Sequence, residues 1–220
     1  MFYIVSCIRI EHPEKKVKEQ KLSTESQSIN IQFCKDIEQI NNCEVLKVGD
    51  KTVLDIYVAN EKENEPDVRY PLFYELGANY NKLLKDNIEV IRLFKNEDQF
   101  AQLLEEDIEE LNYIYNLSEK ILRLFNEEKN RRIEIFSEGL KKHYAGSDDW
   151  TRLMEKLNSI EKIDSGRMIF YLAEGNNFNR AEVKTVNIVF TYSETGDKHK
   201  QLILSFDQNS MEDGAIYIQL

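Results

Sequence analysis

Apolar residues recur at alternating steps of four and three over residues 104–125, and this periodicity constrains the fold more than any other feature of the sequence. The seam consists of Leu104, Ile108, Leu111, Tyr115, Ser118, Leu122 and Phe125. Such spacing aligns one face of an α-helix into a coiled-coil-like seam. Leu103, Ile114 and Ile121 widen the seam into a stripe that can face a protein core. We therefore expect a long helix over residues 97–125.

The helical pattern continues beyond this segment, through Ile133, Phe136, Leu140 and Tyr144. An unbroken helix over residues 97–144 would be about 70 Å long at roughly 1.5 Å per residue. We therefore expect a break near residues 126–130 and an antiparallel helical hairpin. Residues 120–142 carry seven basic and four acidic side chains, so the second arm could partly complement an acidic first arm. A further helix is expected over residues 148–160, capped by Ser147.

The N-terminal part of the chain has a mixed pattern. Residues 2–10 form an apolar, β-branched run typical of a buried central strand, and residues 30–41 favour a short helix. Residues 43–48 and 51–58 flank Gly49-Asp50, which predicts a β-hairpin. Pro71 marks the start of a helix, and residues 88–94 read as another strand.

The C-terminal part holds strand patterns separated by turn clusters. Strands are expected over residues 167–173, 183–192, 201–206 and 215–219. Together these patterns predict an α+β protein with β-rich N-terminal and C-terminal segments, the latter an antiparallel meander, and a long central helical hairpin. The expected regions are 1–95 (mixed β/α), 96–160 (helical, with the coiled-coil-like seam) and 161–220 (meander). Pattern alone leaves open whether the two β-rich segments share one sheet.

Composition and cysteine spacing predict a folded protein with reduced cysteines. Hydrophobic residues make up 41% of the chain, which is enough for a folded core although 31% of residues are charged. Cys7, Cys34 and Cys43 are too few for a disulfide framework, and no histidine lies near them at zinc-ligand spacing. We expect reduced thiols. The chain shows neither a signal-peptide pattern nor a membrane-length apolar run, so a cytoplasmic location is expected.

Acidic charge is concentrated in one stretch. Residues 96–119 hold eight acidic side chains and no Lys or Arg, so they contribute most of the formal net charge of −11. Five of these acids lie within six residues: Glu105, Glu106, Asp107, Glu109 and Glu110. They cannot all face the core beside Leu104, Ile108 and Leu111. A solvated outer helix face is one interpretation, and a docking surface for a basic partner is the other.

The sequence favours a non-catalytic interaction or accessory subunit that binds a protein partner with a basic surface. Tyr113, Leu117 and Leu124 lie off the seam, which suggests contact with another chain and a possible homo-oligomer. Direct nucleic-acid binding is not expected, because the basic concentrations at residues 15–21 and 129–132 are diluted by Glu. The sequence contains no glycine-rich nucleotide motif, and His12, His143 and His199 have no partners at metal-ligand spacing, so no cofactor is expected.

The alternative is a metal-dependent, nuclease-like enzyme. Glu182 and Lys184 form an E-x-K pattern on a predicted strand, where residues two apart point to the same face. Glu182 could hold Mg²⁺ while Lys184 steadies a phosphate or an attacking water. The acid at matching sequence distance, Asp164, falls opposite the far end of that strand, and Glu174 is better placed but lacks the motif context. E-x-K is also common by chance in a chain rich in Glu and Lys, so a solvated strand end is favoured.

Overall fold

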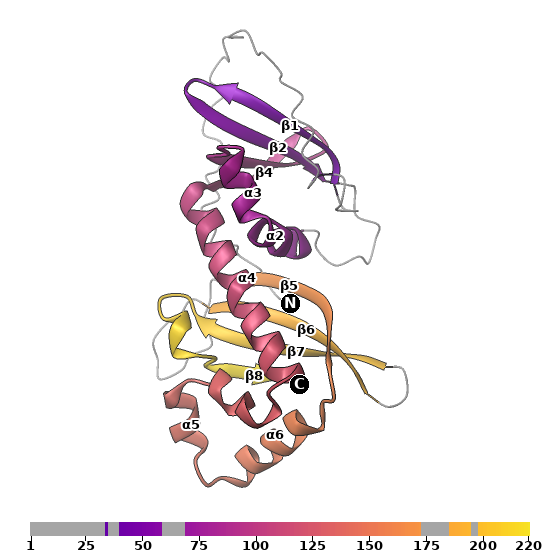
Figure 1. The fold of residues 1–220 in the computed structure, drawn as a ribbon, viewed down its shortest axis with the longest axis vertical. Coiled ribbons are helices and arrows are strands. Elements are labelled where there is room, and N and C mark those ends of the chain that lie inside the picture. Colours follow the sequence, from indigo (N-terminus) through magenta and orange to yellow (C-terminus); the bar gives the residue numbers. More distant parts are fainter. Residues whose placement is uncertain (1–33, 35–39, 59–68, 173–184, 195–197) are drawn as a thin grey trace. The chain divides into compact units, whose positions relative to one another are not determined.

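The structure of the protein is a computed structural model, and it describes residues 34, 40–58, 69–172, 185–194 and 198–220 (Figure 1). The chain divides into two compact units, with the dividing point between Tyr115 and Asn116. This point lies inside the helix α4 (Glu105–Asn126), so each unit contains one part of α4. The two units are described separately below.

The unit that ends at Tyr115 is built on a four-stranded mixed sheet of order β1-β2-β3-β4. Strands β1 (Ile40–Val48) and β2 (Lys51–Val58) form an antiparallel hairpin. The predicted hairpin at Gly49-Asp50 is therefore confirmed. Gly49 has a φ of 67°, and the first loop position of the favoured two-residue turns needs a positive φ that glycine adopts without steric cost.

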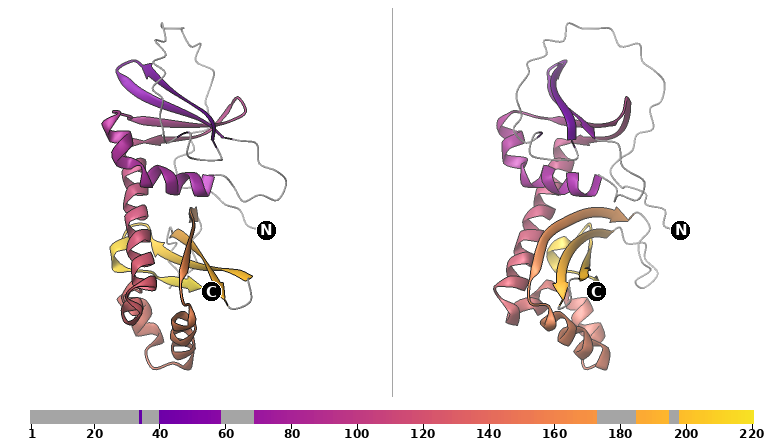
Figure 2. Two further views of the ribbon diagram at one scale, coloured as in Figure 1. Left: turned by 45° about the vertical axis from the view of Figure 1, so that its right-hand side comes forward. Right: turned by 90° about the vertical axis from the view of Figure 1, so that its right-hand side faces the viewer.

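A helical crossover joins the second and third strands of this sheet. The chain passes from β2 through α2 (Arg69–Ala78) and α3 (Tyr80–Lys85) to β3 (Val90–Lys95), which is parallel to β2. Pro71 lies in the first turn of α2, where its missing N–H costs no helical hydrogen bond. Figure 2 shows α2 and α3 along one face of the twisted sheet. The predicted helix at Pro71 and the strand that follows it are confirmed.

The core of this unit lies between the sheet and its helices. The fully buried side chains of the sheet include Leu54 and Ile56 of β2 and Ile91 and Leu93 of β3, and those of the helices include Leu72 and Leu76. Helix α2 approaches α4 closely at Gly77, where an added Cβ would lie 2.4 Å from the carbonyl oxygen of Leu111. Only glycine fits this contact without a shift of the backbone.

The other face of the sheet carries a paired charge and an aromatic stack. Asp55 and Arg92 are register partners on β2 and β3, and Arg92 donates Nε–H and Nη2–H to the two carboxylate oxygens of Asp55 at 2.7 and 2.6 Å. Two pairs further along, on the same face, the rings of Tyr57 and Phe94 stack at 5.1 Å. Partial burial raises the pKa of Tyr57, and the negative charges of Glu44 and Asp55 raise it further.

The structure corrects the predicted start of the long helix. Residues 98–104 form the strand β4 (Asp98–Leu104), antiparallel to β3, and α4 begins only at Glu105. The turn between the strands contains Asn96 in the left-handed region, with a φ of 58°. Asparagine tolerates this conformation better than most residues because its short polar side chain bonds locally. The predicted helix therefore started too close to the N-terminus.

The unit that begins at Asn116 contains the rest of α4, a helical segment and a second sheet. The helical segment comprises a 3₁₀ helix, η1 (Lys129–Ile135), and two α-helices, α5 (Glu138–Tyr144) and α6 (Asp148–Ser159). Helix α4 ends at Asn126, where a break was predicted, and the chain continues as these shorter helices. Ser147 caps α6 as predicted, because its hydroxyl accepts the backbone N–H of Trp150 at 3.1 Å.

The second sheet is the predicted antiparallel meander. Its order is β5-β6-β7-β8, with the bounds β5 (Ile163–Leu172), β6 (Thr185–Glu194), β7 (Lys198–Asp207) and β8 (Tyr217–Gln219). A short 3₁₀ helix, η2 (Met211–Asp213), precedes β8. Backbone bonds join the end of η1 to this region, since Ser137 N–H donates to the Ala215 carbonyl and Ala215 N–H donates to that of Ile135. In the described residues the meander and the sheet β1–β4 are separate sheets.

A buried arginine joins the helix ends of this unit. Arg132 has no exposed surface, and its guanidinium donates to the backbone carbonyls of Phe125, Leu157 and Ile160. The guanidinium also lies 4.8 Å from the ring centroid of Phe125. Next to it, the Asn126 side-chain amide bonds both backbone groups of Ile163, the first residue of β5. These contacts connect the ends of α4 and α6 to the start of the meander.

The predicted fold class is confirmed, because a helical region lies between two β-rich ends. The strand expected over residues 2–10 lies outside the described residues, as does most of the helix expected over residues 30–41, whose last two residues belong to β1. The three-region division stays a prediction. No helix in the described part of the chain is long and apolar enough to cross a membrane.

Candidate partner-binding site

The five acids Glu105, Glu106, Asp107, Glu109 and Glu110, here called the acidic cluster, lie at the N-terminal end of α4. Glu105, Glu106 and Asp107 form the first turn of the helix, directly after strand β4. Negative side chains are favourable there, because the first backbone N–H groups of a helix are unpaired and carry partial positive charge. Part of the acidity therefore stabilises the start of α4.

Asp107 has a definite structural role. The backbone N–H of Leu104, the last residue of β4, donates to Oδ2 of Asp107 at 2.7 Å. An acidic side chain that reaches back by three residues to the residue before the helix is half of a capping box. This role was missed at the sequence level, although the spacing of Leu104 and Asp107 was visible. Asp107 is half-buried.

Glu109 lies beside the neighbouring helix. The hydroxyl of Tyr80, the first residue of α3, donates to a Glu109 carboxylate oxygen at 3.1 Å. Partial burial raises the pKa of Tyr80, and its hydrogen bond to Glu109 raises it further. Glu109 is still exposed, whereas Glu110 is half-buried. The bond fixes the direction of one carboxylate on this surface without removing it from solvent.

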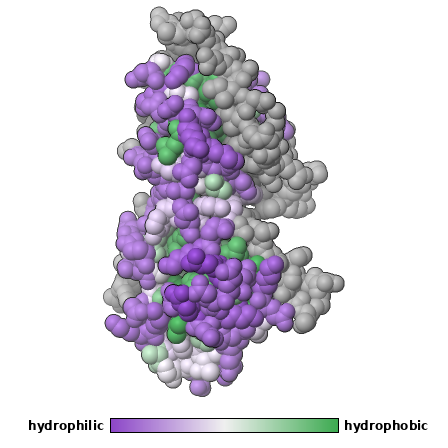
Figure 3. Space-filling model, viewed as in Figure 1, coloured by the Kyte–Doolittle hydropathy of each residue, from purple (hydrophilic) through white to green (hydrophobic). Residues whose placement is uncertain are grey.

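Glu105 and Glu106 are the carboxylates that the fold uses least. Both are exposed, and neither makes a hydrogen bond or an ion pair with another described residue. With Glu109 they give three exposed carboxylates within the first five residues of one helix. On the face of the protein drawn in Figure 3 the described surface is mostly hydrophilic, with small separate hydrophobic patches. Exposed carboxylates at this spacing can attract a cationic surface.

The apolar residues expected beside the seam divide into two groups. Leu124 is buried, with 3% exposure, so it belongs to the core and not to an exposed surface. Tyr113 is 42% exposed, and Leu117 is half-buried. The seam residues Ile108, Leu111 and Phe125 are buried within the chain. Of the three residues suggested for contact with another chain, Tyr113 is the one that remains clearly exposed.

The basic segment after α4 forms ion pairs within itself. Arg131 bonds Glu128 and Glu134, and Lys141 bonds Glu138, all at a spacing of three residues. The hydrogen bond from Arg131 lowers the pKa of Glu134, and the bond from Lys141 lowers that of Glu138. These basic side chains therefore have acidic partners close in sequence.

The alternative E-x-K site cannot be built from the described residues. Glu174, Glu182 and Lys184 lie outside them, and of Asp164 only the backbone is described, as the second residue of β5. No group of three His, Cys, Asp or Glu side chains within the described ranges could hold a metal ion. The described residues thus add nothing to the nuclease-like alternative.

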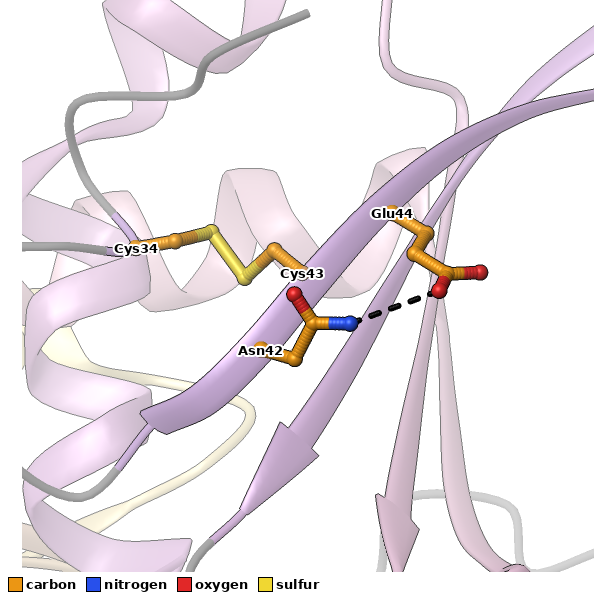
Figure 4. Close-up of a disulfide and its surroundings, with 4 residues drawn as sticks. All are labelled: Cys34, Asn42, Cys43 and Glu44. Carbon is orange, nitrogen blue, oxygen red and sulfur yellow. Dashed lines mark hydrogen bonds between the residues drawn. A yellow bond between two sulfur atoms is a disulfide. The ribbon is translucent and has the colours of Figure 1, made fainter. Parts of the chain in front are cut away.

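A disulfide corrects the prediction of three reduced thiols. Cys34 and Cys43 are bonded, with their Cα atoms 6.1 Å apart, which lies in the ordinary range for disulfides (Figure 4). Cys43 is in the middle of β1, and nine positions separate the two residues. Cysteine counting missed the bond because it considers the number and spacing of cysteines, whereas a bond depends on whether the chain returns to the same place.

Comparison of this chain with protein family models, with curated proteins and with solved structures gives no match.

Proposed function

We propose that this protein is a non-catalytic interaction or accessory protein that docks a basic protein partner on the acidic cluster of α4. The observation that carries the proposal is the group of three exposed carboxylates, Glu105, Glu106 and Glu109, at the start of one helix. The helix dipole and the capping contact of Asp107 account for part of the acidity. Glu105 and Glu106 exceed what these roles require, since a single acidic residue suffices for the cap.

Such a surface acts mainly on the rate of encounter. Exposed charges are screened beyond about 8 Å at physiological salt, so they steer a basic partner into contact more than they hold it there. Binding through the acidic cluster should therefore weaken with increasing salt. The salt dependence distinguishes this mode of docking from an apolar interface.

The experiment compares two variants with the same change in charge. The docking variant E105Q/E106Q/E109Q removes the exposed carboxylates, and Gln keeps nearly the same helix propensity as Glu. The control variant E155Q/E161Q/E212Q removes three exposed carboxylates elsewhere in the chain. Each protein serves as bait in a pull-down from the native host. The proposal expects a basic partner that the wild type and the control retain at low salt, that high salt releases, and that the docking variant loses.

Identical partner lists for the docking variant and the control would overturn the proposal and leave the acids as a solubility feature. A five-residue version that adds D107N and E110Q extends the test to the whole acidic cluster. Loss of the Asp107 cap would weaken the helix in that version, so the triple variant is the decisive one.

Self-association is the second part of the proposal. Exposed Tyr113 lies on α4 close to Glu109 and Glu110, and a second copy could cover it in a coiled-coil-like contact. Light scattering at micromolar concentration tests this part directly. A strictly monomeric mass would remove the homo-oligomer and leave the basic partner in place.

We also propose a cytoplasmic location. The Cys34–Cys43 disulfide argues against this location, because disulfides persist mainly in oxidising compartments. Fractionation of the native host, with thiols blocked at lysis, tests both the location and the state of the bond.

A further inference from the structure

We propose that the Cys34–Cys43 disulfide is a reversible redox tether on the edge of the sheet β1–β4, which a dithiol reductant opens in the folded protein. The proposal does not depend on the acidic cluster. It rests on the position of the bond at the outermost described strand of that sheet and on the partial exposure of both cysteine residues.

Cys43 lies on β1, which is the outermost described strand of its sheet. In the strand order β1-β2-β3-β4, the described strand that pairs with β1 is β2. A strand that is held by a single ladder of hydrogen bonds opens more easily than a central strand. A covalent link at Cys43, in the middle of β1, therefore adds a second restraint to this strand.

The register shows which face of β1 the bond restrains. Cys43 is the partner of Ile56, a residue with no exposed surface, so its side chain is on the core side of the sheet. Its neighbours Asn42 and Glu44 point to the opposite face, where the Asn42 amide donates to the Glu44 carboxylate at 3.3 Å. Figure 4 shows the bond running from Cys34 to one side of β1 while these two side chains lie apart from it.

Both cysteine residues keep some surface exposed to solvent. Cys34 and Cys43 are each partly exposed, unlike the fully buried residues of the neighbouring strands, such as Leu54. Thiol–disulfide exchange requires an attacking thiolate to reach one sulfur, so exposure decides whether a bond can be opened without unfolding. Intracellular disulfides in ordinary cells are mostly transient and redox-sensing, which reconciles this bond with the proposed cytoplasmic location.

The reaction is an exchange with a dithiol, either a small molecule or a protein of the dithiol reductase class. A thiolate of the reductant attacks one sulfur of the pair, forms a mixed disulfide and releases the other cysteine as a thiolate, which takes up a proton. The second thiol of the reductant then displaces the first cysteine. Two electrons and two protons pass to the protein, Cys34 and Cys43 become thiols, and the reductant becomes a disulfide.

The experiment measures hydrogen exchange by mass spectrometry on the full chain, oxidised or treated with dithiothreitol in native buffer. Alkylation of the peptides that contain Cys34 and Cys43 reports the state of the bond. Loss of a restraint of this loop size should speed exchange in β1 by about tenfold or more, while β6 and β7 stay unchanged. Removal of dithiothreitol and addition of oxidised glutathione should restore slow exchange.

Two serine variants complete the test. C34S cannot form the bond, so it should show fast exchange in β1 with or without oxidant. C7S, the matched control, keeps the pair and should respond as the wild type does. The proposal is overturned if alkylation shows no Cys34–Cys43 bond in the oxidised protein, or if the bond opens only in denaturant. It is equally overturned if reduction changes β1 exchange by less than roughly twofold. Should C34S fail to fold, the reduced wild type still decides the outcome.

Discussion

In the sheet β1–β4, Arg92 donates two hydrogen bonds to the carboxylate of Asp55, and its side chain keeps 23% of its surface exposed. In the unit that begins at Asn116, Arg132 is completely buried, and the hydrogen-bond partners that the structure shows for it are three backbone carbonyls. The two units thus provide different hydrogen-bond acceptors for a partly buried arginine and for a fully buried one.

The difference follows from the secondary structure around each arginine. Within a sheet, backbone carbonyls are already paired in the ladders, so a buried arginine needs a side-chain acceptor such as Asp55. The last carbonyls of a helix have no partner within the helix and carry partial negative charge. Arg132 uses these groups at the ends of α4 and α6, and burial lowers its pKa. The carbonyl groups at a helix end can therefore replace a carboxylate as the hydrogen-bond acceptors of a buried arginine.

The largest effect is expected from Arg132→Met. This change removes the donors for the carbonyls of Phe125, Leu157 and Ile160 together and should lower the free energy of unfolding by about 3–5 kcal/mol. The measurement is urea denaturation followed by the fluorescence of Trp150, the single tryptophan, which lies in the same unit. The matched control is Arg131→Met at the neighbouring exposed arginine, and it should change stability much less. Equal losses in the two variants would show that helix carbonyls do not hold Arg132.

A smaller, asymmetric effect is expected at the Asp55–Arg92 pair. Arg92→Met leaves the Asp55 side chain, which is only 3% exposed, without its cation. This change should lower the free energy of unfolding by about 3 kcal/mol. Asp55→Asn leaves an arginine that water can still reach, so it should lower the free energy of unfolding by only about 1 kcal/mol. Urea denaturation followed by far-ultraviolet circular dichroism compares the two. A larger loss of stability for Asp55→Asn than for Arg92→Met would contradict this assignment, because it would mean that the unpaired arginine is the more costly of the two charges.

The smallest effect is expected at the exposed pair of Arg131 and Glu134. The hydrogen bond from Arg131 lowers the pKa of Glu134, so its contribution to stability is complete above the ordinary value near 4.5 and is lost as the pH falls through the lowered value. Wild type and Glu134→Gln should differ slightly in melting temperature at pH 7 and become equal in strong acid. Salt should reduce the difference at pH 7. A difference that grows in acid would contradict the assigned pair.

Several elements of the fold could be predicted because their signals are local. Gly49 meets the need for a positive φ between two strand-forming runs, and Ser147 supplies the hydroxyl that caps α6. Strand β4 was missed because residues 98–104 also fit a helical period. Their state depends on pairing with β3, which a periodic pattern does not contain.

For the candidate site, the sequence indicated the position of the charge but not the role of each acid. Five carboxylates within six residues must largely face solvent, whatever the surrounding fold. That Asp107 caps the helix, and that Tyr80 bonds Glu109, depends on where β4 ends and where α3 lies. The docking role itself stays a prediction.

By itself, the sequence determined the fold class of this protein, the turn at Gly49, the cap at Ser147, the antiparallel meander and the location of its acidic residues. Each of these depends on interactions between residues close along the chain, or on a period that repeats with the backbone. The tertiary structure alone decided the Cys34–Cys43 bond, the strand β4 and the burial of Arg132. These features bring together groups such as Arg132 and Ile160, 28 residues apart, whose meeting depends on how whole elements pack and not on any local preference.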